Sequence, residues 1–129
     1  MYTVPYLSQD GSSLPVKQFH HTSWPEEGIP DTSAGLLNLM DQVQRWQRSS
    51  GNHPIVVHCS GGTGRTGTFI AISNLLERLK TEGVVDVFHI VRTLRLQRPG
   101  LVQTVVRFLY GMHTYSHRNY YRILQTKRK

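Results

Sequence analysis

Hydrophobic residues recur at helical spacing in four parts of the chain. The first run follows Asp31-Thr32-Ser33, which offers an N-cap, and consists of Leu36, Leu39, Met40, Val43 and Trp46 or Gln47. The second ends near Gly83 and consists of Phe69, Ile72, Leu76 and Leu79. The third follows Asp86, ends at Pro99 and consists of Val87, Ile90, Val91 and Leu94. A last helix is predicted from about Thr104, on Val105, Phe108, Leu109 and Met112.

Two shorter segments have the character of strands. Residues 16–24 form a plausible strand with poor alternation, and residues 55–58 form a short apolar run of the kind found in a covered strand. Residues 1–15 contain Pro5, Gly11 and Pro15 and predict an irregular arm, with at most an edge strand before Pro5. Alternation of strand and helix over residues 16–80 predicts an α/β fold with a short central sheet.

Residues 58–67, which read His-Cys-Ser-Gly-Gly-Thr-Gly-Arg-Thr-Gly, contain the only cysteine of the chain. Five residues separate Cys59 from Arg65, and a predicted helix begins near that arginine. Small residues allow a loop to aim its N–H groups inward, and a helix N-terminus adds further donors and a positive field. The loop residues expected to bind phosphate are Ser60, Gly61, Gly62, Thr63, Gly64 and Arg65.

The same positive field favours the thiolate of Cys59. Cysteines at helix N-termini beside cations have pKa values lowered to roughly 3.5–7.5. Arg65 can bind two phosphate oxygens at once, which lysine cannot do. The pattern therefore predicts attack by a thiolate on a phosphate ester, and no metal or cofactor is needed. A buried, inert cysteine in a glycine-rich turn is the alternative interpretation.

These residues resemble the phosphate loop of the tyrosine-specific protein phosphatases, which usually carry alanine where Gly61 stands. Trp24-Pro25-Glu26 resembles the mobile Trp-Pro-Asp loop of that family, and Leu101-Val102-Gln103-Thr104 resembles its glutamine loop. Leu94-Arg95-Leu96-Gln97-Arg98-Pro99 is also similar to the family. The similarity runs from about Val16 to Thr104, with nothing similar in residues 1–15, and corresponds to the C-terminal half of the catalytic domain.

The resemblance implies specific roles. Cys59 would form a phosphocysteine intermediate, and Arg65 would bind the phosphoryl oxygens. His58 would support the cysteine, and the Thr66 hydroxyl would assist the thiolate as leaving group. Gln103 would bind substrate and position the hydrolytic water.

Glu26 stands where the family uses aspartate as general acid. Its side chain is one methylene longer, so we expect impaired activity and not a dead site. Trp-Pro-Glu is also typical of the second, membrane-distal domain of tandem receptor tyrosine phosphatases. The alternative function is therefore a catalytically weak module, a pseudophosphatase, that binds phosphotyrosine or a partner phosphatase domain.

Composition sets wider limits on the protein. The 129 residues suit one domain, and one cysteine cannot form an internal disulfide, which indicates a reducing compartment. We expect a cytoplasmic protein, or the cytoplasmic part of a membrane receptor if the chain is a fragment. No apolar run approaches the ~18 residues of a membrane span.

The net charge of +7 alone would favour a nucleic-acid partner. The basic residues are spread, however, and no aromatic-interleaved basic stripe is present, so the expected partner is a phosphotyrosine protein or peptide. The predicted organisation is an N-terminal arm at residues 1–15, a partial phosphatase domain at 16–117 and a basic tail at 118–129.

Overall fold

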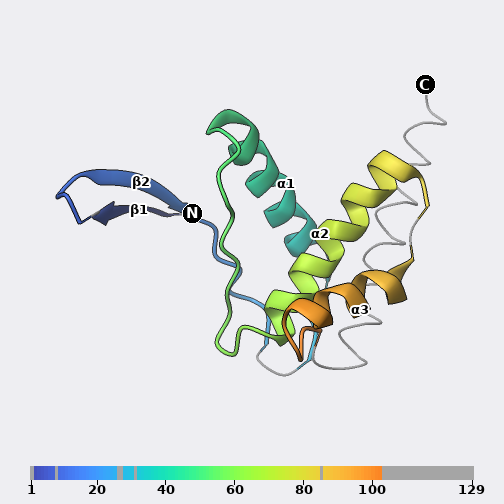
Figure 1. Ribbon diagram of the computed structural model, residues 1–129. Coiled ribbons are helices and arrows are strands. Elements are labelled where there is room, and N and C mark those ends of the chain that lie inside the picture. Colours follow the sequence, from blue (N-terminus) through green and yellow to red (C-terminus); the bar gives the residue numbers. More distant parts are fainter. Residues whose placement is uncertain (1, 8, 26–27, 31, 85, 103–129) are drawn as a thin grey trace. The chain divides into compact units, whose positions relative to one another are not determined.

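The computed structural model describes residues 2–7, 9–25, 28–30, 32–84 and 86–102. The chain divides into two compact units. Figure 1 labels the helices and strands that they contain. The first unit comprises Met1–Trp24 and Thr32–His53, and the second comprises Pro25–Asp31 and Pro54–Lys129. The last predicted helix, from Thr104, and the tail at 118–129 lie outside the described residues.

The first unit begins with an antiparallel pair of strands. Strand β1 (Tyr2–Leu7) pairs with β2 (Ser13–Gln18), and Pro5 lies opposite Pro15. Asp10 closes the turn, because its Oδ1 accepts hydrogen bonds from the Ser12 N–H at 2.9 Å and the Ser12 hydroxyl at 2.7 Å. Both strands of a two-stranded sheet are edges, where proline is tolerated. The edge strand allowed before Pro5 is therefore present, but the irregular structure expected for the rest of the arm is wrong for residues 5–7 and 13–15.

The strand predicted at residues 16–24 lies closer to the N-terminus than expected. Only residues 16–18 of the predicted segment 16–24 belong to β2, and the pair crosses the expected boundary at residue 15. The Lys17 ammonium lies 4.0 Å from the centroid of the Trp46 ring, which is a cation–π contact between β2 and the following helix.

Helix α1 (Ala34–Ser49) completes the first unit, at the position that the periodicity predicts. Ser33 is its N-cap residue, and the buried side chains on the helix are Leu36, Leu37 and Met40. The periodicity predicted Leu39 as a core residue, but Leu39 is half-buried and Leu37 is buried instead. Trp46, also predicted for this face, is 40% exposed. Trp24 is buried in the same unit and meets His21 edge to face.

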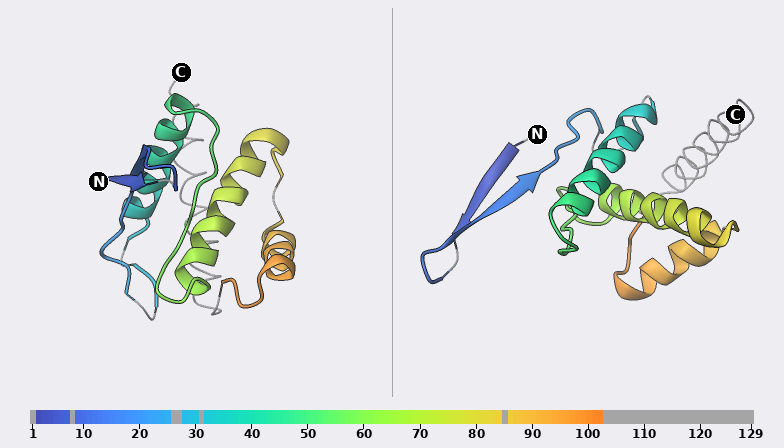
Figure 2. Two further views of the ribbon diagram at one scale, coloured as in Figure 1. Left: turned by 60° about the vertical axis from the view of Figure 1, so that its left-hand side comes forward. Right: turned by 90° about the horizontal axis from the view of Figure 1, so that it is seen from above.

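The second unit is built on helices α2 (Gly64–Glu82) and α3 (Val87–Gln97). Helix α2 ends at Gly83, whose φ of 73° is left-handed. Asp86 caps α3 by accepting a hydrogen bond from the His89 N–H at 3.0 Å. Figures 1 and 2 show that the segment that follows α3, drawn in orange, returns to the N-terminal end of α2.

The core of the second unit fills the angle between these two helices. It consists of Ala71, Leu75, Ile90, Val91, Leu94, Leu101 and Val102. The buried residues of α2 therefore differ from the predicted stripe, in which Phe69, Leu76 and Leu79 are only half-buried. The stripe predicted for α3 is confirmed at Ile90, Val91 and Leu94.

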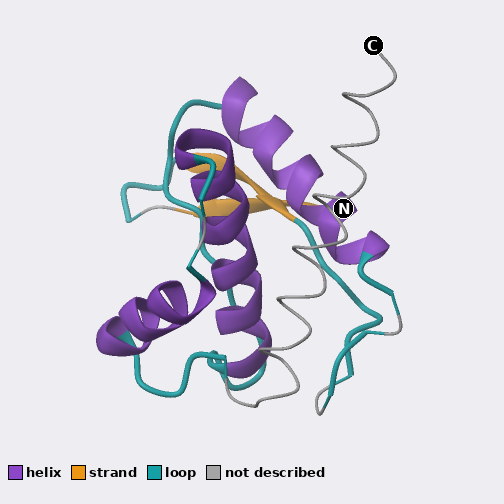
Figure 3. Cartoon of the chain, turned by 90° about the vertical axis from the view of Figure 1, so that its right-hand side faces the viewer, coloured by secondary structure: helices purple, strands orange, loops and turns teal. Residues whose placement is uncertain are grey.

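Residues 55–58 do not form the predicted strand. They belong to the loop that leads into α2, which is green in Figure 1 and has the teal colour of loops in Figure 3. Ile55 is 52% exposed and Val56 is 85% exposed. An apolar run becomes a covered strand only between neighbouring strands, and the two strands that the structure describes pair with each other. The α/β class is confirmed, and the loop and helix of the expected strand-loop-helix cradle are present.

Candidate active site

Cys59 lies at the centre of a short loop that closes on the first turn of α2. The Thr66 hydroxyl donates a hydrogen bond to Cys59 Sγ at 3.0 Å, and the Gly62 N–H donates another at 3.2 Å. Gly62 has a φ of 67°, a left-handed conformation that favours glycine and allows its N–H to reach the sulfur. The loop and the helix thus present donors to the same sulfur atom.

The electrostatics of this arrangement favour the thiolate. Partial burial raises the pKa of the Cys59 thiol. Hydrogen bonds from the Thr66 hydroxyl and from the backbone of Thr66, Gly62 and Gly61 lower the pKa further than burial raises it, to about 7. The thiolate is therefore abundant near neutral pH, as a nucleophile at this position requires.

Arg65 reaches across the same loop. Its guanidinium Nη2 donates a hydrogen bond to the Ser60 hydroxyl at 2.7 Å. Ser60 is the residue next to the cysteine, so the guanidinium contacts the same loop that surrounds the sulfur. The predicted pairing of Cys59 and Arg65 in one loop is consistent with this geometry.

The remaining loop residues have distinct places. Thr63 is the N-cap residue of α2 without a capping hydrogen bond from its side chain, and its carbonyl accepts a hydrogen bond from the Gly67 N–H at 2.9 Å. Gly64 and Thr66 are buried, whereas His58 and Gly61 are exposed. The supporting role of His58 stays a prediction. Glu26 and Gln103 lie outside the described residues, so their placement in the site is also a prediction.

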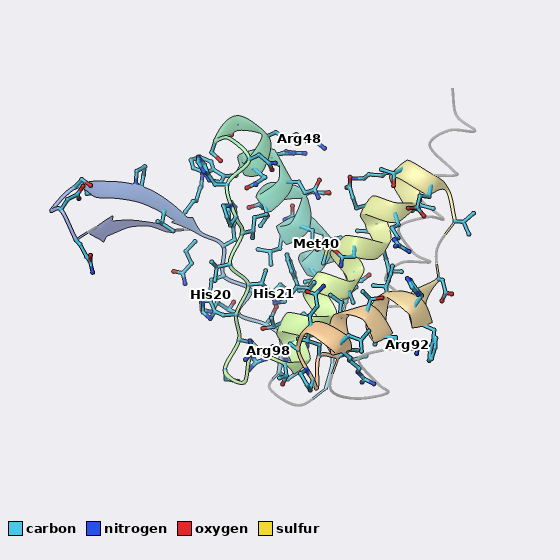
Figure 4. The ribbon with its side chains drawn as sticks, in the orientation of Figure 1. His20, His21, Met40, Arg48, Arg92 and Arg98 are labelled. Carbon is cyan, nitrogen blue, oxygen red and sulfur yellow. The ribbon has the colours of Figure 1, made fainter. Side chains whose placement is uncertain are left out.

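The sequence analysis noted Arg95, in the last turn of α3, and Arg98, its C-cap residue, as part of a segment similar to the family but gave them no role. Arg95 Nε donates a hydrogen bond to the Leu101 carbonyl at 2.9 Å, and its Nη2 donates another to the Val102 carbonyl at 2.7 Å. Arg98 lies against the loop, because a Cβ built on Gly62 would come within 3.1 Å of its Nη2 (Figure 4). The available signal was the position of both arginines at the C-terminal end of a predicted helix, just before the segment similar to the glutamine loop.

The thiol pKa leads to a first prediction. Alkylation of Cys59 by iodoacetamide is expected to rise with pH through a midpoint near 7, because only the thiolate reacts. Thr66→Val removes the hydroxyl donor and should raise the midpoint by roughly one unit, since a hydrogen bond to a charged group contributes about 1.5–3 kcal/mol before solvent screening. Thr66→Ser, which keeps the hydroxyl, is the matched control. Equal midpoints in the valine and serine variants would contradict the assignment of the Thr66 hydroxyl as a donor.

Comparison with known proteins supports the same family. Residues 2–116 match the protein-tyrosine phosphatase family. The match begins before residue 16 and ends after residue 104, so the expected limits of the similarity were too narrow. In particular, the expectation that residues 1–15 do not resemble the family is wrong.

Individual relatives are receptor-type phosphatases. The chain is 54% identical over 107 residues to receptor-type tyrosine-protein phosphatase epsilon of Rattus norvegicus, covering 83% of this chain and 15% of that protein. It is 52% identical over 111 residues to the alpha protein of Mus musculus, with coverage of 83% and 13%. For receptor-type tyrosine-protein phosphatase F of Mus musculus, the identity is 50% over 98 residues, with coverage of 75% and 5%.

The chain therefore spans only a small part of the length of the relatives it matches. Within the described residues, no helix has the length and apolar character needed to cross a membrane. The match covers most of the chain, including the cysteine loop, Arg65 and the segment after α3. This chain belongs to the protein-tyrosine phosphatase family.

Proposed function

We propose that this chain acts as a protein-tyrosine phosphatase domain that hydrolyses phosphotyrosine through a phosphocysteine intermediate, with reduced turnover. The observation that carries the proposal is the environment of Cys59 Sγ. It receives hydrogen bonds from the Thr66 hydroxyl and the Gly62 N–H, its pKa is lowered to about 7, and Arg65 belongs to the same loop. An inert core cysteine would have a raised pKa and no such donors.

The first chemical step transfers the phosphoryl group to the sulfur. Cys59 Sγ attacks phosphorus, the S–P bond forms, and the bond from phosphorus to the phenolic oxygen breaks. Arg65 binds two of the phosphoryl oxygens and stabilises their charge in the transition state, together with N–H groups of the loop. The tyrosine phenolate takes a proton from Glu26 as it leaves.

The second step returns the thiolate. A water molecule positioned by Gln103 attacks phosphorus and gives a proton to the Glu26 carboxylate that the first step left, the S–P bond breaks, and inorganic phosphate leaves. The Thr66 hydroxyl, 3.0 Å from Sγ, donates to the sulfur as it regains its negative charge. The same hydrogen bond therefore favours the nucleophile in the first step and the leaving group in the second.

Glu26 is the reason to expect reduced turnover. Misplacement of a catalytic group by ~1 Å can lower a rate by about 10²-fold, and glutamate carries its carboxyl one methylene further from the backbone than aspartate. This residue also favours a second candidate function, which is a pseudophosphatase module that binds phosphotyrosine or a partner phosphatase domain. In either case we place the chain in the cytoplasmic, membrane-distal part of a receptor, where a thiol remains reduced.

Hydrolysis of p-nitrophenyl phosphate and of a phosphotyrosine peptide by the purified chain tests the proposal. We expect slow release of phosphate and a phosphocysteine that can be trapped by acid quenching. Glu26→Asp should raise the turnover of the phosphotyrosine peptide by roughly 10-fold or more, because tyrosine is the poorer leaving group and needs the acid most. Glu26→Gln is the matched control and should lower it.

The outcomes separate the two candidates. Phosphopeptide binding without measurable phosphate release, in both the natural chain and Glu26→Asp, would support the binding module and contradict the enzyme. If Glu26→Asp leaves the rate unchanged or lower, Glu26 does not limit turnover.

A further inference from the structure

The segment that follows α3 packs against the loop that surrounds Cys59. The Val102 N–H donates a hydrogen bond to the Thr63 carbonyl at 3.3 Å. A Cβ built on Gly100 would lie in van der Waals contact with Thr63 Cγ2, at 3.7 Å. Arg98 lies against Gly62 on the same loop. We call the loop residues 60–65, which are expected to bind phosphate, the phosphate cradle. Residues 98–102 thus contact two residues of this cradle, Gly62 and Thr63, from a different part of the chain.

Val102 occupies an unusual conformation within this segment. Its φ of 57° is left-handed, which is strained for a β-branched side chain. Such conformations persist only where the surrounding structure holds them. The Val102 side chain is buried, with 2% exposed, and its N–H is bonded to Thr63. Burial of the side chain and the hydrogen bond to Thr63 are thus contacts that hold Val102 in this conformation.

Arg95 binds the carbonyl groups of Leu101 and Val102. The Leu101 carbonyl belongs to the same peptide group as the Val102 N–H. The Arg95 guanidinium donates to the Leu101 carbonyl at 2.9 Å and to the Val102 carbonyl at 2.7 Å. Two donors in a fixed planar fork fix the orientation of both carbonyls, which a single lysine ammonium cannot reproduce. Arg95 lies six residues before the first carbonyl, on the last turn of α3.

We propose that Arg95 is a positioning residue for the phosphate cradle, acting through the strained Val102 and the Thr63 carbonyl. The guanidinium touches neither the sulfur nor the expected position of the oxyanion. It fixes the Leu101 and Val102 peptide groups, the Val102 N–H holds Thr63, and Thr63 begins the helix whose first turn faces Cys59. The proposal rests on the proposed function, because it assumes that the loop binds a phosphate group. Its test measures anion binding and thiol alkylation and does not require catalytic turnover.

The test uses Arg95→Lys, which keeps the charge and loses the fork, and Arg95→Gln, which keeps one amide donor. Two properties of the cradle are measured. The first is its affinity for tungstate, an unreactive oxyanion, and the second is the pH midpoint of Cys59 alkylation. We expect a roughly tenfold weaker tungstate affinity and a higher alkylation midpoint in both variants. Arg92→Lys, at an exposed position of the same helix, is the matched control and should change neither property.

A purely structural role would have a different signature. The melting temperature of the variants, measured by circular dichroism, would then change. The tungstate affinity and the alkylation midpoint of the folded variants would stay at the values of the natural chain, and the proposal would be wrong. The readouts do not depend on catalysis. A chain that hydrolyses no phosphotyrosine but loses tungstate affinity in Arg95→Lys would contradict the proposed function and support the role of Arg95.

Discussion

Replacing Cys59 with serine is expected to reduce aryl-phosphate hydrolysis by about 10⁴-fold or more. The thiol has a pKa of about 7 and is substantially ionised at neutral pH, whereas a serine hydroxyl in the same place keeps its proton. Serine is close in size to cysteine, and the donors from Thr66 and Gly62 can still meet its oxygen. The substitution therefore removes the nucleophile with little change in the shape of the loop.

Binding of the oxyanion should respond in the opposite way. A thiolate beneath a phosphate places two negative charges close together, and the serine variant removes one of them. We expect tungstate affinity to stay the same or to increase in Cys59→Ser, while acid quenching traps no phosphoenzyme. Hydrolysis that survives in this variant would show that another group is the nucleophile. A collapse of tungstate affinity with unchanged melting would show that the anion is bound elsewhere.

Replacing Gly67 with alanine is expected to destabilise the chain by about 3 kcal/mol, or roughly 10 °C in melting temperature. A Cβ at this position would lie 2.4 Å from the Val102 backbone nitrogen, 2.9 Å from Leu101 Cα and 3.0 Å from the Leu101 carbonyl carbon. All three are backbone atoms, and the two residues they belong to are buried, with 4% and 2% exposed. No flexible side chain can move aside to make room for the methyl group.

Relief of this clash requires the segment after α3 to move away from α2. That movement would stretch the hydrogen bond from the Val102 N–H to the Thr63 carbonyl, so the anion affinity of the cradle should fall together with the stability. Gly61→Ala is the matched control for melting, because its Cβ would meet only the Thr63 hydroxyl oxygen, at 3.7 Å. Equal melting temperatures for the two variants would contradict the close approach of α2 and residues 101–102.

The helices could be predicted because their signals are local. Hydrophobic periodicity located α1, α2 and α3, and Asp86 caps α3 as expected. The choice of buried residue was less certain, since Leu37 replaced Leu39 on α1, and Ala71 and Leu75 replaced Phe69 and Leu76 on α2. Periodicity gives the face of a helix only to within about one residue, and the neighbouring element decides which edge of that face is covered.

The strands were predicted poorly because pairing is not a local property. Two prolines suggested an irregular arm, yet Pro5 and Pro15 face each other in a two-stranded sheet. The apolar run at residues 55–58 suggested a covered strand, yet Val56 is 85% exposed. In both cases the decisive factor is which other segment lies alongside, and the residues themselves do not contain that information.

The sequence by itself determined the chemistry of the site, because Cys59, Gly62, Arg65 and Thr66 lie within eight consecutive residues and a loop followed by a helix start brings them together. Only the tertiary structure decided what holds that loop in place. The Arg95 guanidinium bonds to the carbonyls of Leu101 and Val102, and the Val102 N–H bonds to the Thr63 carbonyl, so partners more than thirty residues apart meet through backbone acceptors and donors. Contacts between backbone groups leave no pattern of residue types, so they become visible only when the chain has folded.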